Sequence, residues 1–211
     1  MRILLTGFTP FGEHGINPTQ KLVEALGTRF VHAGAEVFPR LLRTHYRRAE
    51  EDFDRALAET APDAVLSFGL NYQVDEIRPE RIAVNFDEGE EDGRQVARMI
   101  AADGPVGYFS THPVDAIVAA LRAAGLPVKA SNHAGAYICN HIFYHARHRF
   151  ERERVPTLMG FIHVPPLPEM IKPEDAKRTG LAMDKLVEAA RVTVATLARE
   201  IAAANAVARA S

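Results

Sequence analysis

The sequence is short of thiols, since its 211 residues contain a single cysteine, Cys139. One cysteine excludes an intrachain disulfide framework and is typical of a protein in a reducing compartment. The chain also lacks a run of about 18 apolar residues, the length that a membrane-spanning helix needs. Its formal net charge is only −2, so no strong overall field favours nucleic acid. We therefore expect a cytoplasmic protein with neither a nucleic-acid nor a membrane partner.

What the chain does contain is ordinary for a globular protein. Hydrophobic residues make up 47% and charged residues 25% of the sequence. The length suits one domain, and we expect residues 1–211 to form it. The first residues, "MRILLTGF", have too short an apolar stretch for a signal peptide and favour a buried strand. Neither an internal repeat nor a low-complexity tract divides the chain.

Short apolar runs alternate with longer amphipathic segments. The runs predict strands at Arg2–Thr6, Ala35–Thr44, Asp63–Leu70, Glu80–Asp87, Pro127–Ser131 and Pro156–Pro166, with Pro39 indicating an edge or a bulge. The segments predict helices at Asn17–Gly27, Tyr46–Pro62 and His112–Pro127, from Ala136 onward, and from about Pro173 toward the end. This alternation predicts an α/β fold whose mostly parallel sheet is covered by helices on both faces.

Several loops of mixed composition follow the predicted strands. "TGFTPFG", "SFGLNY", "SNHAGAY" and "FIHVPP" each come at or just after a strand's carboxyl end. Ligands of such sheets bind outside the carboxyl ends of the strands. We therefore expect a binding site where these four loops meet.

Cys139 follows the small-residue turn "NHAG" and lies near the start of a predicted helix. The partial positive charge at a helix N-terminus favours thiolate over thiol. Free backbone N–H groups in the same turn can stabilise an oxyanion. The alternative is a thiol buried for packing, which is the commoner state of a free cysteine.

A nucleophilic cysteine needs a base, usually histidine. His163 stands near the end of an apolar strand, where it is either that base or a hydrogen-bonded core residue. His141, His145 and His148 follow Cys139 on the same predicted helix, and His141 and His145 are badly spaced to reach the thiol. The His141–His145 pair has the spacing of a helical metal site but lacks further ligands at helpful offsets, so we favour a solvated basic face. His14, His32, His45 and His112 are expected in loops or at helix starts, where surface histidine is unremarkable.

The base in turn needs an orienting carboxylate. Most acids lie on helix faces, but Glu80 opens the extended segment "ERIAVN" after a buried strand. A buried acid needs a partner, and either a histidine or the neighbouring Arg81 can serve.

Four blocks carry a resemblance to a known family. They are "TGFTPFG…NP" (Thr6–Pro18), "ERIAVN" (Glu80–Asn85), "SNHAGAYICN" (Ser131–Asn140) and "GFIHVP" (Gly160–Pro165). In this order and spacing the sequence resembles pyroglutamyl peptidase I, the pyrrolidone carboxyl peptidases. The resemblance implies a cysteine exopeptidase that removes N-terminal pyroglutamate through a thioester. It implies Cys139 as nucleophile, His163 as base and Glu80 as orienting acid, without a metal or organic cofactor.

The same resemblance implies the fold, the pocket and the assembly. The fold is a single α/β domain with a twisted sheet between helices, of the phosphorylase/hydrolase-like kind. The implied pocket has aromatic walls at Phe8 and Phe11 and main-chain contacts at Leu70, and it is flanked by Tyr137 and Ile138. The partners are peptides with an N-terminal pyroglutamyl residue, and the chain forms a homo-oligomer, dimeric or tetrameric.

Two departures from the family pattern stand out. "NYQV" (Asn71–Val74) replaces a usual Gly-Gly-Arg cluster, and Glu90 stands where an arginine usually helps to hold the oxyanion or the charge balance of the site. Glu90 lies in the acidic loop 87–93, a candidate mobile lid. Arg94, Arg81 or backbone amides can supply the missing donor. The departure leaves open an amidase or thioesterase with an altered pocket, or a pyroglutamate-binding protein without turnover.

Overall fold

The computed structural model describes residues 1–12 and 15–210. A six-stranded sheet forms its centre, in the order β2-β3-β1-β4-β10-β5. The strands are β1 (Arg2–Phe8), β2 (Phe30–His32), β3 (Ala35–Leu42), β4 (Ala64–Leu70), β5 (Arg78–Pro79) and β10 (Leu158–Val164). The four inner strands are mutually parallel, and the short outer strands β2 and β5 pair antiparallel. The mostly parallel sheet expected from the sequence is confirmed.

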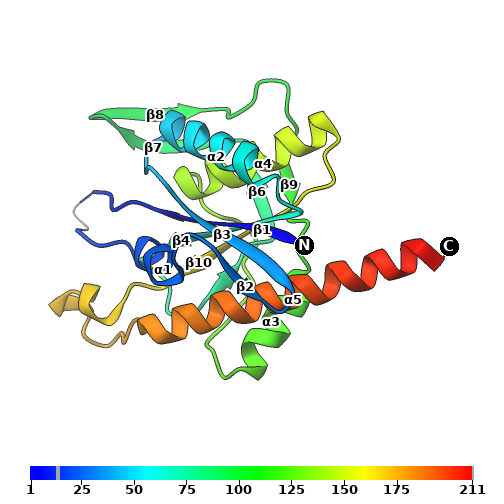
Figure 1. Ribbon diagram of the computed structural model, residues 1–211. Helices are drawn as coiled ribbons and strands as arrows, with labels where there is room; N and C mark the ends of the chain where they lie inside the picture. The colour runs from blue at the N-terminus through cyan, green and yellow to red at the C-terminus, as the bar shows by residue number, and fades with distance from the viewer. Residues whose placement is uncertain (13–14, 211) are drawn as a thin grey trace.

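Helices cover both faces of this sheet (Figure 1). They are α1 (Pro18–Leu26), α2 (Tyr46–Thr60), α3 (Val114–Ala123), α4 (Ile138–Glu153) and α5 (Met183–Ala210), with 3-10 turns at η1 (Pro168–Met170) and η2 (Pro173–Asp175). α2 and α4 pack on one face, and α1, α3 and α5 pack on the other. The result is a three-layer α/β domain.

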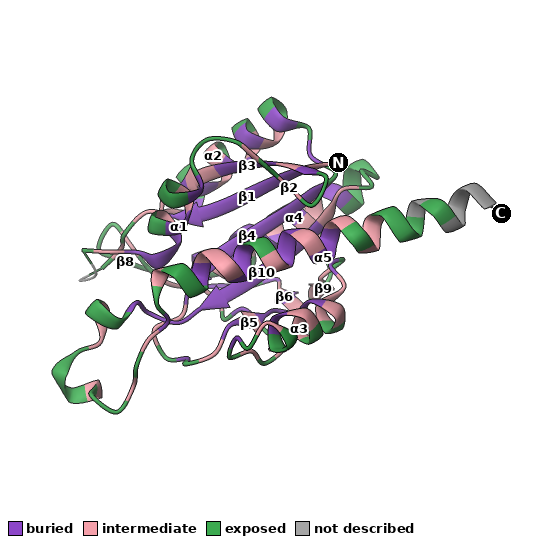
Figure 2. Cartoon of the chain, turned by 60° about the horizontal axis from the view of Figure 1, so that its bottom comes forward, coloured by how far each residue is buried: buried purple, intermediate pink, exposed green. Residues whose placement is uncertain are grey.

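Alternating side chains of β1 divide the core into two clusters. Ile3 and Leu5 point toward α1, α3 and α5, whereas Leu4 points toward α2 and α4. All three are fully buried, as expected for a central strand whose successive residues face opposite sides. Figure 2 shows the sheet almost wholly buried between exposed outer helix surfaces.

Local signals set the start and end of α1 as expected. The Asn17 side chain caps the helix by accepting a hydrogen bond from the Thr19 amide at 3.0 Å. Pro18 occupies the first turn, and Gly27 ends the helix with a positive φ of 73°.

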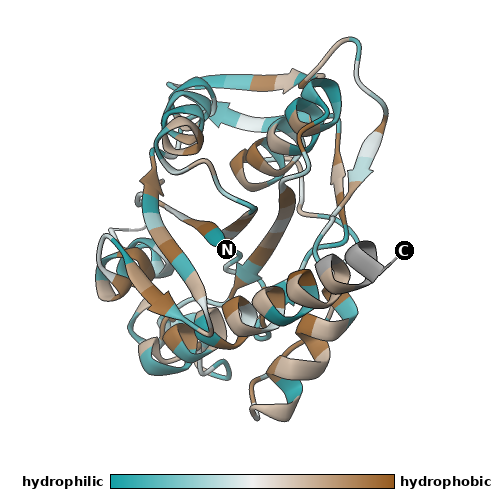
Figure 3. Ribbon diagram, turned by 45° about the vertical axis from the view of Figure 1, so that its right-hand side comes forward, coloured by the Kyte–Doolittle hydropathy of each residue, from teal (hydrophilic) through white to brown (hydrophobic). Residues whose placement is uncertain are grey.

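The last helix begins later than the sequence suggests. α5 starts at Met183, not near Pro173, because residues 168–182 wrap a neighbouring loop instead. Arg178 donates to the carbonyls of Tyr72 and Val74, and Gly180 adopts a φ of +68° that disfavours helix. The helix itself is amphipathic, with polar and apolar positions interleaved along its length (Figure 3).

Four further strands form two small antiparallel pairs. β6 (Ile82–Val84) pairs with β9 (Gly107–Phe109), and β7 (Asp87–Glu91) pairs with β8 (Arg94–Arg98). The acidic segment 87–93 is therefore part of a hairpin rather than a loop. Its two turn residues, Asp92 and Gly93, have φ of 50° and 74°, the signature of a type I′ turn.

The edge expected at Pro39 is present locally: β3 is an inner strand, but β2 pairs only with Ala35–Val37, so β3 is unpaired on that side at Pro39. One other expectation needs correction. Residues 127–131 form no strand; they run parallel to residues 77–81 through isolated bridges at Val128 and Ser131.

Candidate active site

Cys139 lies in the first turn of α4, as the sequence predicts. The helix is capped at Tyr137 without a side-chain hydrogen bond, so first-turn amides remain free to bind an anion. The thiol packs against the backbone of β4 at Gly69, where an added Cβ would come within 2.6 Å of Sγ. Glycine at position 69 thus makes room for the sulfur beside the sheet.

A buried imidazole–carboxylate pair lies next to the thiol. His163 is on β10 in register with Gly69 of β4, and its Nδ1 lies 2.7 Å from Oε1 of Glu80. Glu80 follows β5, and its amide donates to the Phe161 carbonyl at 2.9 Å. The two residues are only 5% and 1% exposed, which leaves the carboxylate little water to compete with the imidazole. Arg81 is not the partner of Glu80, because its guanidinium pairs with Asp115 of α3.

The surroundings of His163 raise the pKa of its imidazole. Burial alone lowers the pKa of His163, but the adjacent Cys139 sulfur and the Glu80 carboxylate outweigh it and raise the pKa of the imidazole well above its ordinary range. A raised pKa means that the imidazolium is favoured at neutral pH. The arrangement therefore places a positively charged imidazole between the Cys139 sulfur and a buried carboxylate.

A cavity of about 120 Å³ opens beside the sulfur. Its lining includes Cys139, His163 and every residue expected from the sequence to hold a substrate, namely Phe8, Phe11, Leu70, Tyr137 and Ile138. Phe8, Leu70 and His163 are at or next to the ends of β1, β4 and β10, so the cavity lies at the carboxyl edge of the sheet. This is the edge where the strand-end loops predicted a site.

The cavity also has lining residues that the sequence analysis missed. These are Asn17, Thr44 and the three residues from Ala134 to Ala136. Thr44 donates to the Thr9 carbonyl at 2.6 Å, and Asn17 donates to the same carbonyl at 3.2 Å. Both brace the loop that carries Phe11. Asn17 belongs to the "NP" of the first block, but its role as the cap of α1 explains that motif without a place in the cavity.

The family usually has an arginine at the position of Glu90, and no other cationic side chain takes its place at the described part of the cavity. Glu90 is exposed on β7, and its carbonyl accepts a hydrogen bond from the Tyr137 hydroxyl at 3.4 Å. Arg98 of β8 lies 3.5 Å from Asp87 and stacks over Tyr46. Among the described residues that line the cavity, none is an arginine or a lysine. Backbone amides are thus the donors nearest to hand.

The histidines after Cys139 do not form a solvated face. His141 is only 3% exposed, because α2 and β7 cover it, and His148 bonds the Tyr108 hydroxyl at 2.9 Å. His112 is also buried rather than superficial, and this burial lowers its pKa to about 3. His45 caps α2 and His32 lies in β2. His14 lies outside the described residues.

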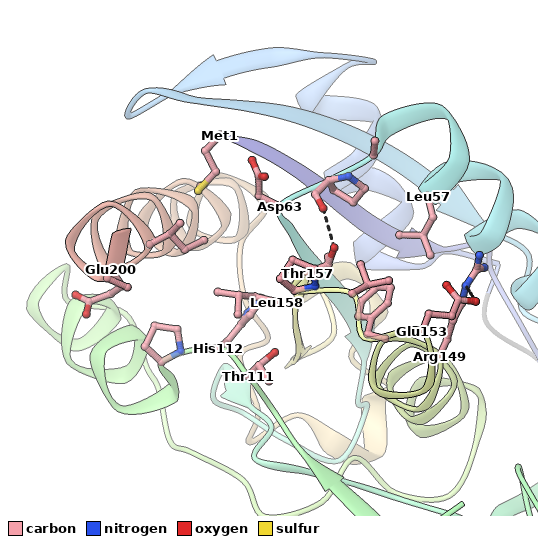
Figure 4. Close-up of a pocket in the computed structure, with 18 of the residues that line it drawn as sticks. Met1, Leu57, Asp63, Thr111, His112, Arg149, Glu153, Thr157, Leu158 and Glu200 are labelled. Atoms are coloured by element: carbon pink, nitrogen blue, oxygen red, sulfur yellow. Dashed lines mark hydrogen bonds and ion pairs between the residues drawn. The ribbon is translucent and has the colours of Figure 1, made fainter. Parts of the chain in front are cut away.

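A larger groove of about 1060 Å³ lies at the opposite edge of the sheet. Figure 4 shows it bounded by Glu200 of α5, by Thr157 and Leu158 at the start of β10, and by Arg149 of α4. It contains neither a thiol nor an imidazole–carboxylate pair. Within the described ranges no group of three or more His, Cys, Asp or Glu side chains is arranged to hold a metal ion, and no helix is long and apolar enough to cross a membrane.

A thiol in a helix's first turn, beside a buried imidazole–carboxylate pair at the carboxyl edge of a parallel sheet, defines the class as a cysteine hydrolase. The profile of the pyroglutamyl peptidase family matches residues 1–200. The chain belongs to this family of cysteine-type omega peptidases.

Relatives and solved structures agree with this assignment. A pyrrolidone-carboxylate peptidase of Oceanobacillus iheyensis is 39% identical over 78% of this chain and 83% of its own. Pyrrolidone-carboxylate peptidase 1 of Ralstonia nicotianae is 36% identical over 93% of each chain. A mutant pyrrolidone carboxyl peptidase from Pyrococcus furiosus is similar in structure, with a TM-score of 0.89, 33% identity and coverage of 95% and 100%.

Proposed function

We propose that the protein hydrolyses the amide bond after an N-terminal pyroglutamyl (5-oxoproline) residue of peptides. The observation that carries this proposal is the cavity beside Cys139, which is small, largely apolar and walled by aromatic rings. A lactam ring is compact, with flat apolar faces and one N–H and one C=O. Such a group suits an apolar slot with a few main-chain contacts.

The rings around the cavity have defined positions. Phe8 packs against Phe161 with centroids 6.2 Å apart, and Phe11 against Tyr137 at 6.1 Å. We infer that Phe8 and Phe11 hold the faces of the lactam and that the backbone of Leu70 bonds its polar edge. Tyr137 and Ile138 then close the pocket next to the sulfur.

The chemistry follows from the three buried groups. His163 keeps Cys139 as a thiolate or takes its proton as sulfur attacks the pyroglutamyl carbonyl. The tetrahedral intermediate collapses to a thioester as the amine leaves with a proton from His163. Water, deprotonated by His163, then hydrolyses the thioester and returns free pyroglutamate and the thiol. Glu80 fixes the imidazole tautomer through Nδ1 and stabilises its charged form.

The oxyanion needs donors, and the family arginine is absent. We infer that amides in the first turn of α4 take this role, because Arg81 pairs with Asp115 and Arg94 is exposed and does not line the cavity. A site with backbone donors alone still stabilises an oxyanion but lacks the long-range field of a cation.

We also infer a cytoplasmic location and a homo-oligomer, dimeric or tetrameric. A lone thiol at the reaction centre needs reducing surroundings to stay active. Exposed large apolar side chains, Val106 at 88% and Phe109 at 71%, are suited to burial between subunits. Light scattering after size exclusion measures the assembly, and a monomer at micromolar concentration would contradict it.

The decisive experiment is hydrolysis of a chromogenic pyroglutamyl amide. We expect turnover that is abolished by Cys139→Ser and by a thiol alkylator. Matched amides of proline and glutamate are controls that test whether the lactam is required. Absence of turnover by the native chain at any pH would contradict the proposal.

A second candidate is binding without turnover, or acyl transfer from another substrate by the same three groups. Glu90 in place of arginine is the observation that favours it. Calorimetry with free pyroglutamate separates these functions: tight binding without amide hydrolysis supports the binding protein. Thioester hydrolysis without pyroglutamyl amide hydrolysis supports the altered enzyme.

A further inference from the structure

His141 is enclosed between two carboxylates on the helix that carries Cys139. Its Nδ1 lies 3.0 Å from both carboxylate oxygens of Asp87, and its Nε2 lies 3.0 Å from Oε1 of Glu50. The side chain is 4% exposed, and Asp87 is fully buried. An ionised carboxylate only accepts hydrogen bonds, so between two ionised carboxylates both ring nitrogens donate and the ring is an imidazolium.

These three residues belong to three different elements. Glu50 is on α2, His141 is on α4, and Asp87 is the first residue of the β7–β8 hairpin. The imidazolium therefore joins the hairpin to both helices on this face of the sheet. Figure 1 shows the hairpin beside α2 and α4.

The hairpin in turn supports a wall of the cavity. The Glu88 amide donates to the Ala136 carbonyl at 2.7 Å, just before the first turn of α4. Gly89 lies so close to Tyr137 that an added Cβ would come within 2.5 Å of its ring. Tyr46 of α2 meets the same ring edge-on at 5.6 Å. The position of the hairpin therefore constrains the position of the Tyr137 ring at the cavity.

We propose that His141 is a positioning residue, whose imidazolium holds Asp87 and so sets the β7–β8 hairpin and Tyr137 against the pocket. His141 touches neither the thiol nor the cavity. The effect on catalysis rests on the proposed function, because it assumes that Tyr137 contacts the substrate. The effect on the hairpin does not depend on that assumption.

The position of His141 makes the hairpin sensitive to alkaline pH. Burial lowers the pKa of His141, but Asp87 and Glu50 outweigh it and raise the pKa above its ordinary range. The charged and titratable groups around the ring are Asp87 and Arg98 from the hairpin, Glu50 and Tyr46 from α2, and His145 from α4. Loss of the proton removes one hydrogen bond and leaves two carboxylates facing a neutral ring.

The kinetic test compares His141→Gln with His145→Gln. His145 is one turn further along α4 and bonds Glu50 and Asp54 but not Asp87, so it is the matched control. We expect His141→Gln to raise KM for a pyroglutamyl amide about tenfold, with kcat changed about twofold or less. His145→Gln should keep the native KM. Equal KM values for both variants would overturn the proposal.

The hairpin is also tested without any turnover, in the Cys139→Ser background. Trypsin can cut after the exposed Arg94 and Arg98, and mass spectrometry follows those two cuts. We expect them to be about tenfold faster in His141→Gln than in His145→Gln. Adding Asp87→Asn to His141→Gln should restore protection, because an amide pair carries no buried charge.

A pH series on the chain with native His141 and Asp87 gives a test that does not depend on whether a variant folds. Cleavage after Arg94 and Arg98 should accelerate as pH rises from about 7 to 10, relative both to an unstructured reference peptide and to cleavage at arginines outside the hairpin, because loss of the His163 proton loosens the whole fold. A flat ratio would overturn the proposal. If the native chain fails to hydrolyse pyroglutamyl amides but the hairpin responds as described, the proposed function falls and the role of His141 in the hairpin stands.

Discussion

At the scale of the residue, the position of Glu80 is the most demanding feature of the site. A carboxylate that is 1% exposed is costly to keep ionised unless a partner compensates it, and the only side-chain partner found for it among the described residues is His163. Its second oxygen, Oε2, is buried without a hydrogen-bond partner. Glu80 is therefore held by its hydrogen bond and charge interaction with His163, and not by a wider polar network among the described residues.

Replacement of Glu80 by glutamine tests this pair. Glutamine keeps the shape but neither stabilises an imidazolium nor enforces one tautomer, so kcat/KM should fall by about a hundredfold or more. The variant should still fold because volume is conserved, but its melting temperature should fall modestly as the His163 imidazolium loses its charged partner. Kinetics with a pyroglutamyl amide and thermal unfolding measure the two quantities, with Glu151→Gln on the exposed part of α4 as control. Full activity of Glu80→Gln would remove Glu80 from the reaction.

Gly69 offers a second test at this scale. Its added Cβ would lie 2.6 Å from the Cys139 sulfur and 2.7 Å from the Phe161 ring, so Gly69→Ala has to push one of them. We expect a loss of about 1–3 kcal/mol in the free energy of unfolding and a marked fall in kcat. Gly15→Ala is the control, because no described residue other than its chain neighbours lies within 4 Å of the added Cβ. Native kinetics and stability in Gly69→Ala would show that the sulfur has free space.

At the scale of the element, the strand β10 is tied to the segment after β5 by the His163–Glu80 bond. Because the pKa of His163 is raised on folding from its ordinary value of 6.5, the protonated ring stabilises the fold. That contribution is fully present below the ordinary value and is lost as pH rises through the raised value.

The corresponding measurement is urea unfolding over a pH series. The native chain should lose stability at alkaline pH more steeply than His163→Gln, which has no titrating ring at this position. Activity should follow a bell-shaped profile of kcat/KM, with its alkaline limb shifted upward by the same cause. Parallel stability curves for the two proteins would show that the ring is not charged in the folded state.

Some strands of this fold could be predicted from the sequence and others could not. Strands such as β1 and β4 were predictable because an unbroken apolar run in a strand-length segment has few other uses. The edge that holds the cavity was predictable because strand ends in a parallel sheet meet there, whereas the individual substrate-holding residues were expected only from the resemblance to the family. The β7–β8 hairpin was missed although "DG" marks its turn, because its exposed strands are polar and lack apolar alternation. The burial of His141 was missed because it depends on that hairpin.

At the scale of the whole molecule, the sheet separates two apolar clusters with different tasks. The cluster of α2 and α4 supports Cys139 and Tyr137, whereas the cluster of α1, α3 and α5 holds the opposite face. Stability and catalysis can therefore be changed separately.

Leu197 of α5 provides the test. It is fully buried in the cluster remote from the cavity, so Leu197→Ala should cost about 2–5 kcal/mol of unfolding free energy. At a temperature where the variant remains folded, its kcat/KM should stay near the native value. Ala203→Ser on the exposed side of α5 is the control. A large fall in kcat/KM without loss of stability would show that α5 communicates with the site.

The single thiol of the chain has a practical consequence. Since Cys139 is the only cysteine and it lines the cavity, every equivalent of a thiol-directed mass tag taken up by a pure sample reports one accessible cavity. Intact-mass spectrometry can then count accessible cavities per subunit directly. The fraction that takes up no tag is the fraction whose thiol is oxidised or blocked, so the redox history of a sample can be obtained from one mass shift.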